Sequence, residues 1–149
     1  MGYRPFGTAH AVPDAQGVSD VPAGRKILIV DDEPDLAATC ARLVRQMGHE
    51  PILALTGPDA LRLIDSERPD LVLTDLHLPG VDGLGVLRHA RRGDRPTPVI
   101  LVTAYTSGAA QRQAREAGAV AYLPKPFSLS ALRAAVECAL AESAPTASR

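Results

Sequence analysis

Five short runs of mainly apolar residues recur along this chain, and they constrain its fold more than any other feature. Each run stands between longer segments that carry apolar residues at helical spacing. Short apolar runs of this kind are typical of strands that are buried on both faces of a parallel sheet. The predicted strands cover residues 26–30, 51–55, 70–74, 99–102 and 120–123.

The segments between the runs are predicted to be helices. The first begins at Pro34, where a missing N–H costs little, and ends at Gly48, a common helix C-cap residue. The second begins at Gly57, and the others cover 84–92, 107–117 and 128–141. Leu129, Leu132, Val136 and Leu140 are predicted to form the buried stripe of the last helix. Strands that alternate with helices predict an α/β fold with a doubly wound, five-stranded parallel sheet.

Length and composition restrict the domain organisation. A chain of 149 residues with 46% hydrophobic residues is sufficient for one domain with a sizeable core. Residues 1–24 contain several prolines and glycines without periodicity, and residues 143–149 are small and polar. We therefore predict a flexible N-terminal extension at 1–24, one domain at 25–142 and a flexible tail at 143–149.

Charge and cysteine content exclude several classes of protein. The formal net charge of −1 gives no basic footprint, so direct nucleic-acid binding is not expected. No apolar run approaches the ~20 residues of a membrane span. Cys40 and Cys138 lack ligand spacing and are predicted to be free, buried thiols, which fits the reducing cytoplasm.

Polar residues stand at the carboxyl ends of four of the five predicted strands. The first strand ends in Asp31, Asp32 and Glu33, and the third ends at Asp75. Thr103 follows the fourth strand and Lys125 follows the fifth. Because ligands of such folds bind beyond the carboxyl ends of the strands, these side chains are expected to share one edge of the sheet.

Taken together, these side chains suit the capture of a phosphoryl group. Neighbouring carboxylates stay ionised only beside a compensating cation, and oxygen ligands with room for water suit Mg²⁺. A lysine and a hydroxyl can bind phosphoryl oxygens, and one carboxylate can act as the nucleophile. Simpler interpretations remain open at this point. Asp31 or Asp32 could cap the first helix, and Thr103 and Lys125 could be ordinary strand and turn residues.

Five motifs in order resemble the response-regulator receiver family. The resemblance covers about residues 25–142 and implies the five-stranded, flavodoxin-like (βα)5 fold, in a stand-alone receiver similar to chemotaxis regulators. The motifs are 27–33 (ILIVDDE), 70–75 (DLVLTD), 78–83 (LPGVDG), 102–104 (VTA) and 122–127 (YLPKPF).

The resemblance also implies roles for individual residues. Asp75 corresponds to the phosphoacceptor, and Lys125 to the residue that pairs with a phosphate oxygen. Asp31, Asp32, Asp75 and the backbone carbonyl of His77 correspond to ligands of Mg²⁺, or of Mn²⁺ in its place. Thr103 and Tyr122 correspond to the switch pair, in which Tyr122 turns inward when Thr103 moves toward the phosphate.

Further features are implied by the same family. A cis peptide is expected between Lys125 and Pro126. His77 and Tyr105 stand where family members tune the lifetime of the phosphoryl group, and their bulk suggests slow self-dephosphorylation.

The expected function is that of a single-domain response regulator. A sensor histidine kinase or a histidine phosphotransfer protein would phosphorylate Asp75, and the face of the fourth helix, fifth strand and fifth helix would change shape. Such a chain is not an enzyme beyond its own phosphorylation and dephosphorylation. It is expected to be a cytoplasmic monomer or weak dimer that contacts neither a membrane nor nucleic acid. Because no effector module follows, it is expected to signal through an unidentified protein.

Two alternatives remain open. The chain could be a receiver-like scaffold that works without phosphorylation, although Asp75 and the other site residues are present. It could also be a small aspartyl-phosphate phosphohydrolase of the haloacid-dehalogenase type. That family places a second aspartate two residues after the nucleophile, where this chain has His77.

Overall fold

The computed structural model describes residues 24–93, 95–104 and 107–142 of the chain. The segments predicted to be flexible, 1–24 and 143–149, lie outside the described residues apart from Gly24. Tyr105 also lies outside them.

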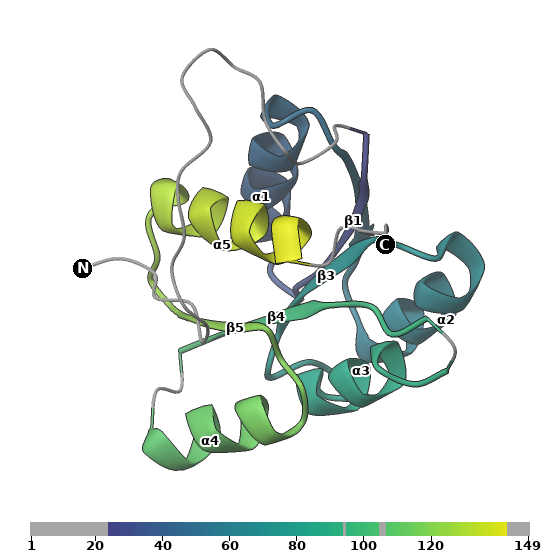
Figure 1. Ribbon diagram of the computed structural model, residues 1–149, viewed down its shortest axis with the longest axis vertical. Coiled ribbons are helices and arrows are strands. Elements are labelled where there is room, and N and C mark those ends of the chain that lie inside the picture. Colours follow the sequence, from purple (N-terminus) through teal and green to yellow (C-terminus); the bar gives the residue numbers. More distant parts are fainter. Residues whose placement is uncertain (1–23, 94, 105–106, 143–149) are drawn as a thin grey trace.

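A parallel sheet of five strands forms the centre of the molecule (Figure 1). The strands follow the order β2-β1-β3-β4-β5, which is the doubly wound arrangement that the sequence predicts. Strand β1 has the predicted bounds, β2 begins and ends one residue earlier than predicted, β3 and β5 begin and end one residue later, and β4 ends one residue later. The strands are β1 (Lys26–Val30), β2 (Glu50–Ala54), β3 (Leu71–Asp75), β4 (Val99–Thr103) and β5 (Ala121–Pro124).

Helices cover both faces of this sheet. Figure 1 shows α1 and α5 on one face and α2, α3 and α4 on the other. Successive strand residues alternate between two hydrophobic clusters, since Ile27 and Ile29 contact the α1–α5 side and Leu28 and Val30 the other side. The helices are α1 (Pro34–Gln46), α2 (Gly57–Glu67), α3 (Gly83–Ala90), α4 (Gly108–Glu116) and α5 (Leu129–Glu142).

Helix ends account for two errors in the sequence prediction. Helix α3 begins at Gly83 because the Asp82 carboxylate accepts a hydrogen bond from the Gly85 N–H at 3.0 Å, and it ends at Ala90 rather than at residue 92. Leu129, predicted to be buried, is 51% exposed. The Ser128 hydroxyl accepts a hydrogen bond from the Ala131 N–H, so Leu129 stands in the first turn of α5, beyond the core.

Two further expectations can be compared with the structure. Both cysteines are free, but only Cys40 is buried, and Cys138 is half-buried. Among the described helices, none is long and apolar enough to span a membrane.

Candidate functional site

Strand register places the predicted site residues side by side. Val30 of β1 pairs with Thr74 of β3, so the residue after β1, Asp31, comes beside Asp75 at the end of β3. On the other side of β3, Thr103 of β4 pairs with Pro124 of β5. Lys125 therefore follows directly beside Thr103, and its N–H donates to the Thr103 carbonyl at 2.8 Å.

Three carboxylates form a compact acidic group at this edge. One oxygen each of Asp31, Asp32 and Asp75 lies within 4.8 Å of the others. Asp31 and Asp75 are only 5% and 8% exposed, whereas Asp32 faces solvent. Burial raises the pKa of the Asp31 carboxyl, and the backbone hydrogen bond from Glu33 N–H at 2.8 Å and the charge of Lys125 oppose that shift.

Lys125 supplies the positive charge that this acidic group needs. Its Nζ donates to Asp75 Oδ2 at 2.8 Å and to Asp31 Oδ2 at 3.4 Å, and it lies 3.6 Å from Glu33 Oε1. Burial by itself lowers the pKa of the Lys125 ammonium. The hydrogen bond to Asp75 and the charges of the three carboxylates outweigh burial, and the pKa is raised.

The simpler interpretation of the acids as helix caps is wrong. Glu33, not Asp31 or Asp32, is the N-cap residue of α1, and it makes no side-chain cap hydrogen bond. Asp31 accepts instead from the Glu33 N–H, outside the helix. The acids are therefore available for binding rather than needed to begin α1.

The remaining predicted residues surround this group. Thr103 is fully buried at the end of β4, and the peptide between Lys125 and Pro126 is cis, as expected. His77 is exposed, and its N–H donates to Asp75 Oδ1 at 3.2 Å. Tyr122 is buried on the α2–α4 side of the sheet, only 3% exposed.

A buried thiol lies beneath the acids but takes no part in their chemistry. Cys40 lines the same small internal space as Asp31 and Asp75. Burial, with a contribution from the Asp31 charge, raises the pKa of this thiol to about 11. It therefore stays protonated near neutral pH, which disfavours it as a nucleophile or metal ligand.

Sequence reasoning missed two contributors to the site. Glu33 was seen in the acidic run, but its position near Lys125 depends on how α1 begins. Gly83 carries no chemical group, yet it is the residue against which Asp75 is packed. A Cβ at position 83 would lie 2.3 Å from the Asp75 carbonyl oxygen and 2.7 Å from the Leu76 Cα.

We expect Gly83→Ala to displace the backbone of Asp75. Because both obstructing atoms belong to the backbone, the variant should lose about 2 kcal/mol of unfolding free energy and should react more slowly at Asp75. Gly108→Ala is the matched control, since Gly108 also begins a helix and a Cβ there would meet nothing within 4 Å. Urea unfolding of both variants measures the difference. Equal stability of the two would contradict the packing role of Gly83.

The donor set of this site fits a hard divalent cation. All three grouped side chains offer carboxylate oxygens, and the exposure of Asp32 leaves one side open to water. Mg²⁺ binds in proteins through one or two carboxylates while keeping several waters. The site thus combines a group of three carboxylates with a lysine that contacts two of them.

Comparison with known proteins agrees with this geometry. The family model described as the response regulator receiver domain matches residues 27–137. The sporulation initiation phosphotransferase F of Bacillus subtilis is 36% identical, over 75% of this chain and 90% of that protein. The transcriptional regulatory protein PrrA of Mycobacterium tuberculosis is 37% identical over 82% of this chain. The match covers 52% of PrrA, so the chain spans about half the length of that relative.

Solved structures give the same result. A CheY-like response regulator receiver domain protein from Methanospirillum hungatei has a TM-score of 0.76 and 30% identity, over 81% of this chain and 97% of that one. The receiver domain of the sensor histidine kinase PA1611 from Pseudomonas aeruginosa has a TM-score of 0.70 and 30% identity, over 79% of this chain and 98% of that one. The latter structure holds a magnesium ion coordinated in its active site cleft.

Proposed function

Because the chain belongs to the response regulator receiver family, we propose that it accepts a phosphoryl group on Asp75 from a phosphohistidine. The donor is a sensor histidine kinase or a histidine phosphotransfer protein. In this proposal, residues 25–142 form the receiver domain. The observation that carries the proposal is the contact of Asp75 Oδ2 with Lys125 Nζ at 2.8 Å, beside the acids at the end of β1.

The transfer uses Asp75 as the nucleophile. A carboxylate oxygen of Asp75 attacks phosphorus, and the bond from phosphorus to the donor imidazole nitrogen breaks, with its electron pair kept by the imidazole. The product is an acyl phosphate on Asp75. Lys125, already within hydrogen-bond distance, neutralises charge on the transferred oxygens. The His77 N–H at Asp75 Oδ1 holds the carboxylate in one orientation.

Asp31, Asp32, Asp75 and the backbone carbonyl of His77 are the proposed ligands of Mg²⁺, with Mn²⁺ as a substitute. When bound, the ion would offset negative charge on the phosphoryl oxygens. Asp31 is fixed for this role by the Glu33 N–H and Lys125. Asp32 differs from Asp31, because it is exposed and contributes a charge close to two buried acids.

We expect Asp32→Asn to weaken Mg²⁺ binding at least about ten-fold while leaving the fold intact. The substitution removes one charged ligand of the cation, which weakens binding. In the metal-free protein it also reduces the repulsion between neighbouring carboxylates. Isothermal titration with MgCl₂ measures the affinity, and urea unfolding without metal should show equal or higher stability. Asp35→Asn, on the exposed first turn of α1, is the control. Unchanged affinity in Asp32→Asn would remove this residue from the ligand set.

The proposed output is a shape change at the face formed by α4, β5 and α5. In this proposal, Thr103 moves toward the phosphoryl group and Tyr122 fills the space next to it. Phosphorylation then stabilises the inward position of Tyr122. A shift of such an element from mostly one state to mostly the other requires about 5 kcal/mol of differential interaction.

In this proposal, the chain acts as a single-domain response regulator. The alignment that covers 90% of the sporulation initiation phosphotransferase F supports a chain that transmits its signal through another protein. That partner would be a downstream target or the next histidine of a relay. Slow self-dephosphorylation, suggested by His77 and Tyr105, stays a prediction because Tyr105 lies outside the described residues.

Phosphotransfer from a phosphorylated histidine phosphotransfer protein tests the function. The chain should take up phosphate while the donor loses it, in equal amounts. The same preparation should not turn over p-nitrophenyl phosphate many times, which separates a receiver from a phosphohydrolase. Absence of transfer from several donors and from acetyl phosphate would favour the scaffold, and sustained hydrolysis would favour the phosphohydrolase.

A further inference from the structure

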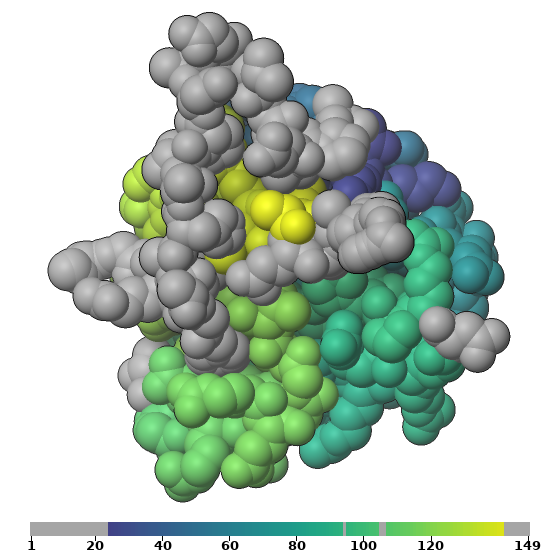
Figure 2. Space-filling view, in the orientation of Figure 1, coloured from purple at the N-terminus to yellow at the C-terminus, as the bar shows by residue number. Residues whose placement is uncertain are grey.

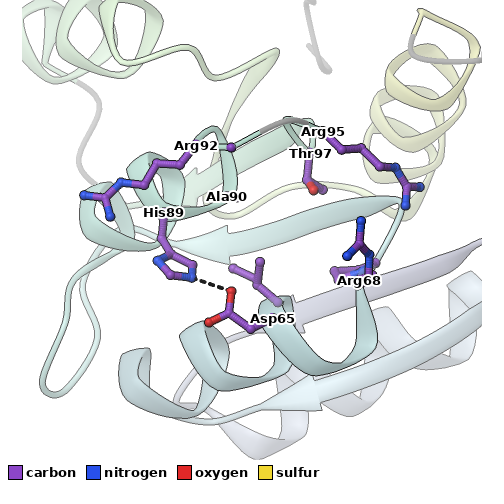
Figure 3. Close-up of a pocket in the computed structure, with 10 residues that line it drawn as sticks. Asp65, Arg68, His89, Ala90, Arg92, Arg95 and Thr97 are labelled. Atoms are coloured by element: carbon purple, nitrogen blue, oxygen red, sulfur yellow. Dashed lines mark hydrogen bonds and ion pairs between the residues drawn. The ribbon is translucent and has the colours of Figure 1, made fainter.

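A second cleft lies at the opposite edge of the sheet from Asp75. It is formed where α2 and α3 end, and it has a volume of about 260 Å³. Its lining includes Arg68, just after α2, and Arg92 and Arg95, which follow α3. Figure 3 shows the cleft, with Arg92 at one end and Arg68 and Arg95 at the other.

The charges in this cleft are unevenly balanced. Arg95 pairs with Asp70 at 3.2 Å, and His89 Nε2 contacts Asp65 Oδ1 at 2.9 Å between the two ends of the cleft. Within the described part of the chain, Arg68 and Arg92 form no ion pair. Asp94 lies outside the described residues. Among the described residues at the cleft, positive charge therefore remains at both ends, although the whole chain has a net charge of −1.

The helix dipole explains why basic residues stand at the ends of α2 and α3, but it does not explain why they share a cleft. Arg68 is one of these residues. It is the C-cap residue of α2 and has φ of 50°, the left-handed conformation in which glycine is favoured. Cations near helix C-termini do stabilise the helix dipole, which accounts for basic residues at these ends. A dipole does not require these arginines to line a common cleft.

We propose that this cleft binds an extended acidic segment of a partner protein. Arginine groups at two separated ends suit carboxylates that are several residues apart along a peptide, because each can accept charge-assisted hydrogen bonds. A nucleic-acid backbone fits less well, since Asp65 and Asp70 would repel its closely spaced phosphates. The surface is separate from the Asp75 site, so the inference does not depend on the proposed function.

The test uses a fluorescent peptide with a glutamate at every fourth position among glycines and serines, and a second peptide that has glutamine in place of glutamate. Anisotropy gives the affinity, and backbone amide shifts of Ala90, Gly93 and Thr97 locate the binding. The glutamate peptide should shift these amides and the glutamine peptide should not. Added NaCl should weaken the binding.

Two variants remove the guanidinium groups without harm to the fold. Arg68→Gly releases the left-handed strain and should be at least as stable as the parent, while Arg92→Gln changes an exposed side chain. Each should weaken the glutamate peptide about ten-fold. Arg42→Gln, an exposed arginine on α1 across the sheet, should leave the affinity unchanged. Phosphorylation by acetyl phosphate should be equal in all three variants and the parent.

Several results would overturn the inference. Absence of amide shifts, equal shifts with the glutamine peptide, or equal weakening by Arg42→Gln would show that the cleft does not recognise acidic peptides. Stronger binding of an oligothymidylate than of the glutamate peptide would point to nucleic acid instead. Loss of stability in Arg68→Gly without loss of binding would leave Arg68 with a structural role only.

Discussion

Asp75→Asn is expected to acquire no phosphate from acetyl phosphate under conditions in which the parent chain is fully phosphorylated. The substitution keeps the size of the side chain but replaces the carboxylate nucleophile by an amide. The fold should persist, because the single asparagine oxygen can still accept from either Lys125 Nζ or the His77 N–H, and the loss of one carboxylate relieves repulsion from Asp31 and Asp32. Intact-protein mass spectrometry measures the uptake directly.

Asp82→Asn is the matched control for this loss. Asp82 lies in the loop between β3 and α3, and its carboxylate caps α3 through the Gly85 N–H. Asparagine and aspartate are comparable N-cap residues, so this variant should be phosphorylated like the parent. Phosphorylation of Asp75→Asn at the parent's level would place the acceptor elsewhere, with Asp31 and Asp32 as the nearest carboxylates.

Lys125→Met is expected to reduce the rate of phosphorylation by about a hundred-fold or more. The loss of one pre-positioned cation beside a reacting group typically removes about 3 kcal/mol of transition-state stabilisation. Methionine keeps much of the apolar stem and removes only the ammonium group, which contacts Asp75, Asp31 and Glu33. Initial rates with saturating Mg²⁺ measure the effect.

The same variant should be less stable without metal. Removal of Lys125 leaves the nearly buried Asp31 and Asp75 without their counter-charge, which is expected to cost about 3 kcal/mol of unfolding free energy. Mg²⁺ should restore part of this loss, because binding to the folded state stabilises it by linkage. A loss that Mg²⁺ does not reduce would contradict the electrostatic explanation.

Lys26→Met provides the comparison for Lys125. Lys26 Nζ pairs with Glu67 at 3.2 Å, but these side chains are 38% and 42% exposed and lie at the other edge of the sheet. The variant should change the unfolding free energy by less than about 1 kcal/mol and should be phosphorylated like the parent. Similar losses in both lysine variants would mean that Lys125 acts only through general stability.

Much of the fold was predictable from the sequence, because buried parallel strands appear as short apolar runs. The same patterns placed Asp31, Asp75, Thr103 and Lys125 at strand ends, and the topology then brings strand ends together. Their roles came from the resemblance to the family rather than from periodicity. The structure adds the contacts of Lys125 with Asp75 and Asp31. These contacts could not be predicted from the sequence pattern, because they depend on the positions of side chains from three different strand ends.

The features that sequence reasoning missed depend on tertiary contacts. Leu129 fits the apolar stripe of α5, but its place in the first turn leaves it exposed. Gly83 offers no functional group, and its importance comes from the backbone packed against it. Arg91, Arg92 and Arg95 lie close together in the sequence. In the fold, Arg92 and Arg95 line the cleft with Arg68, while Arg91 lies beside Gly118.

We propose that Asp75 accepts a phosphoryl group and that this reaction needs a divalent cation. The most direct test is incubation of the parent chain with acetyl phosphate, with Mg²⁺ or with EDTA, followed by intact mass measurement and peptide mapping. We expect a gain of one phosphate that requires Mg²⁺ and maps to the peptide containing Asp75. An equal gain in EDTA, a phosphate on another residue, or no gain by the folded protein would contradict it.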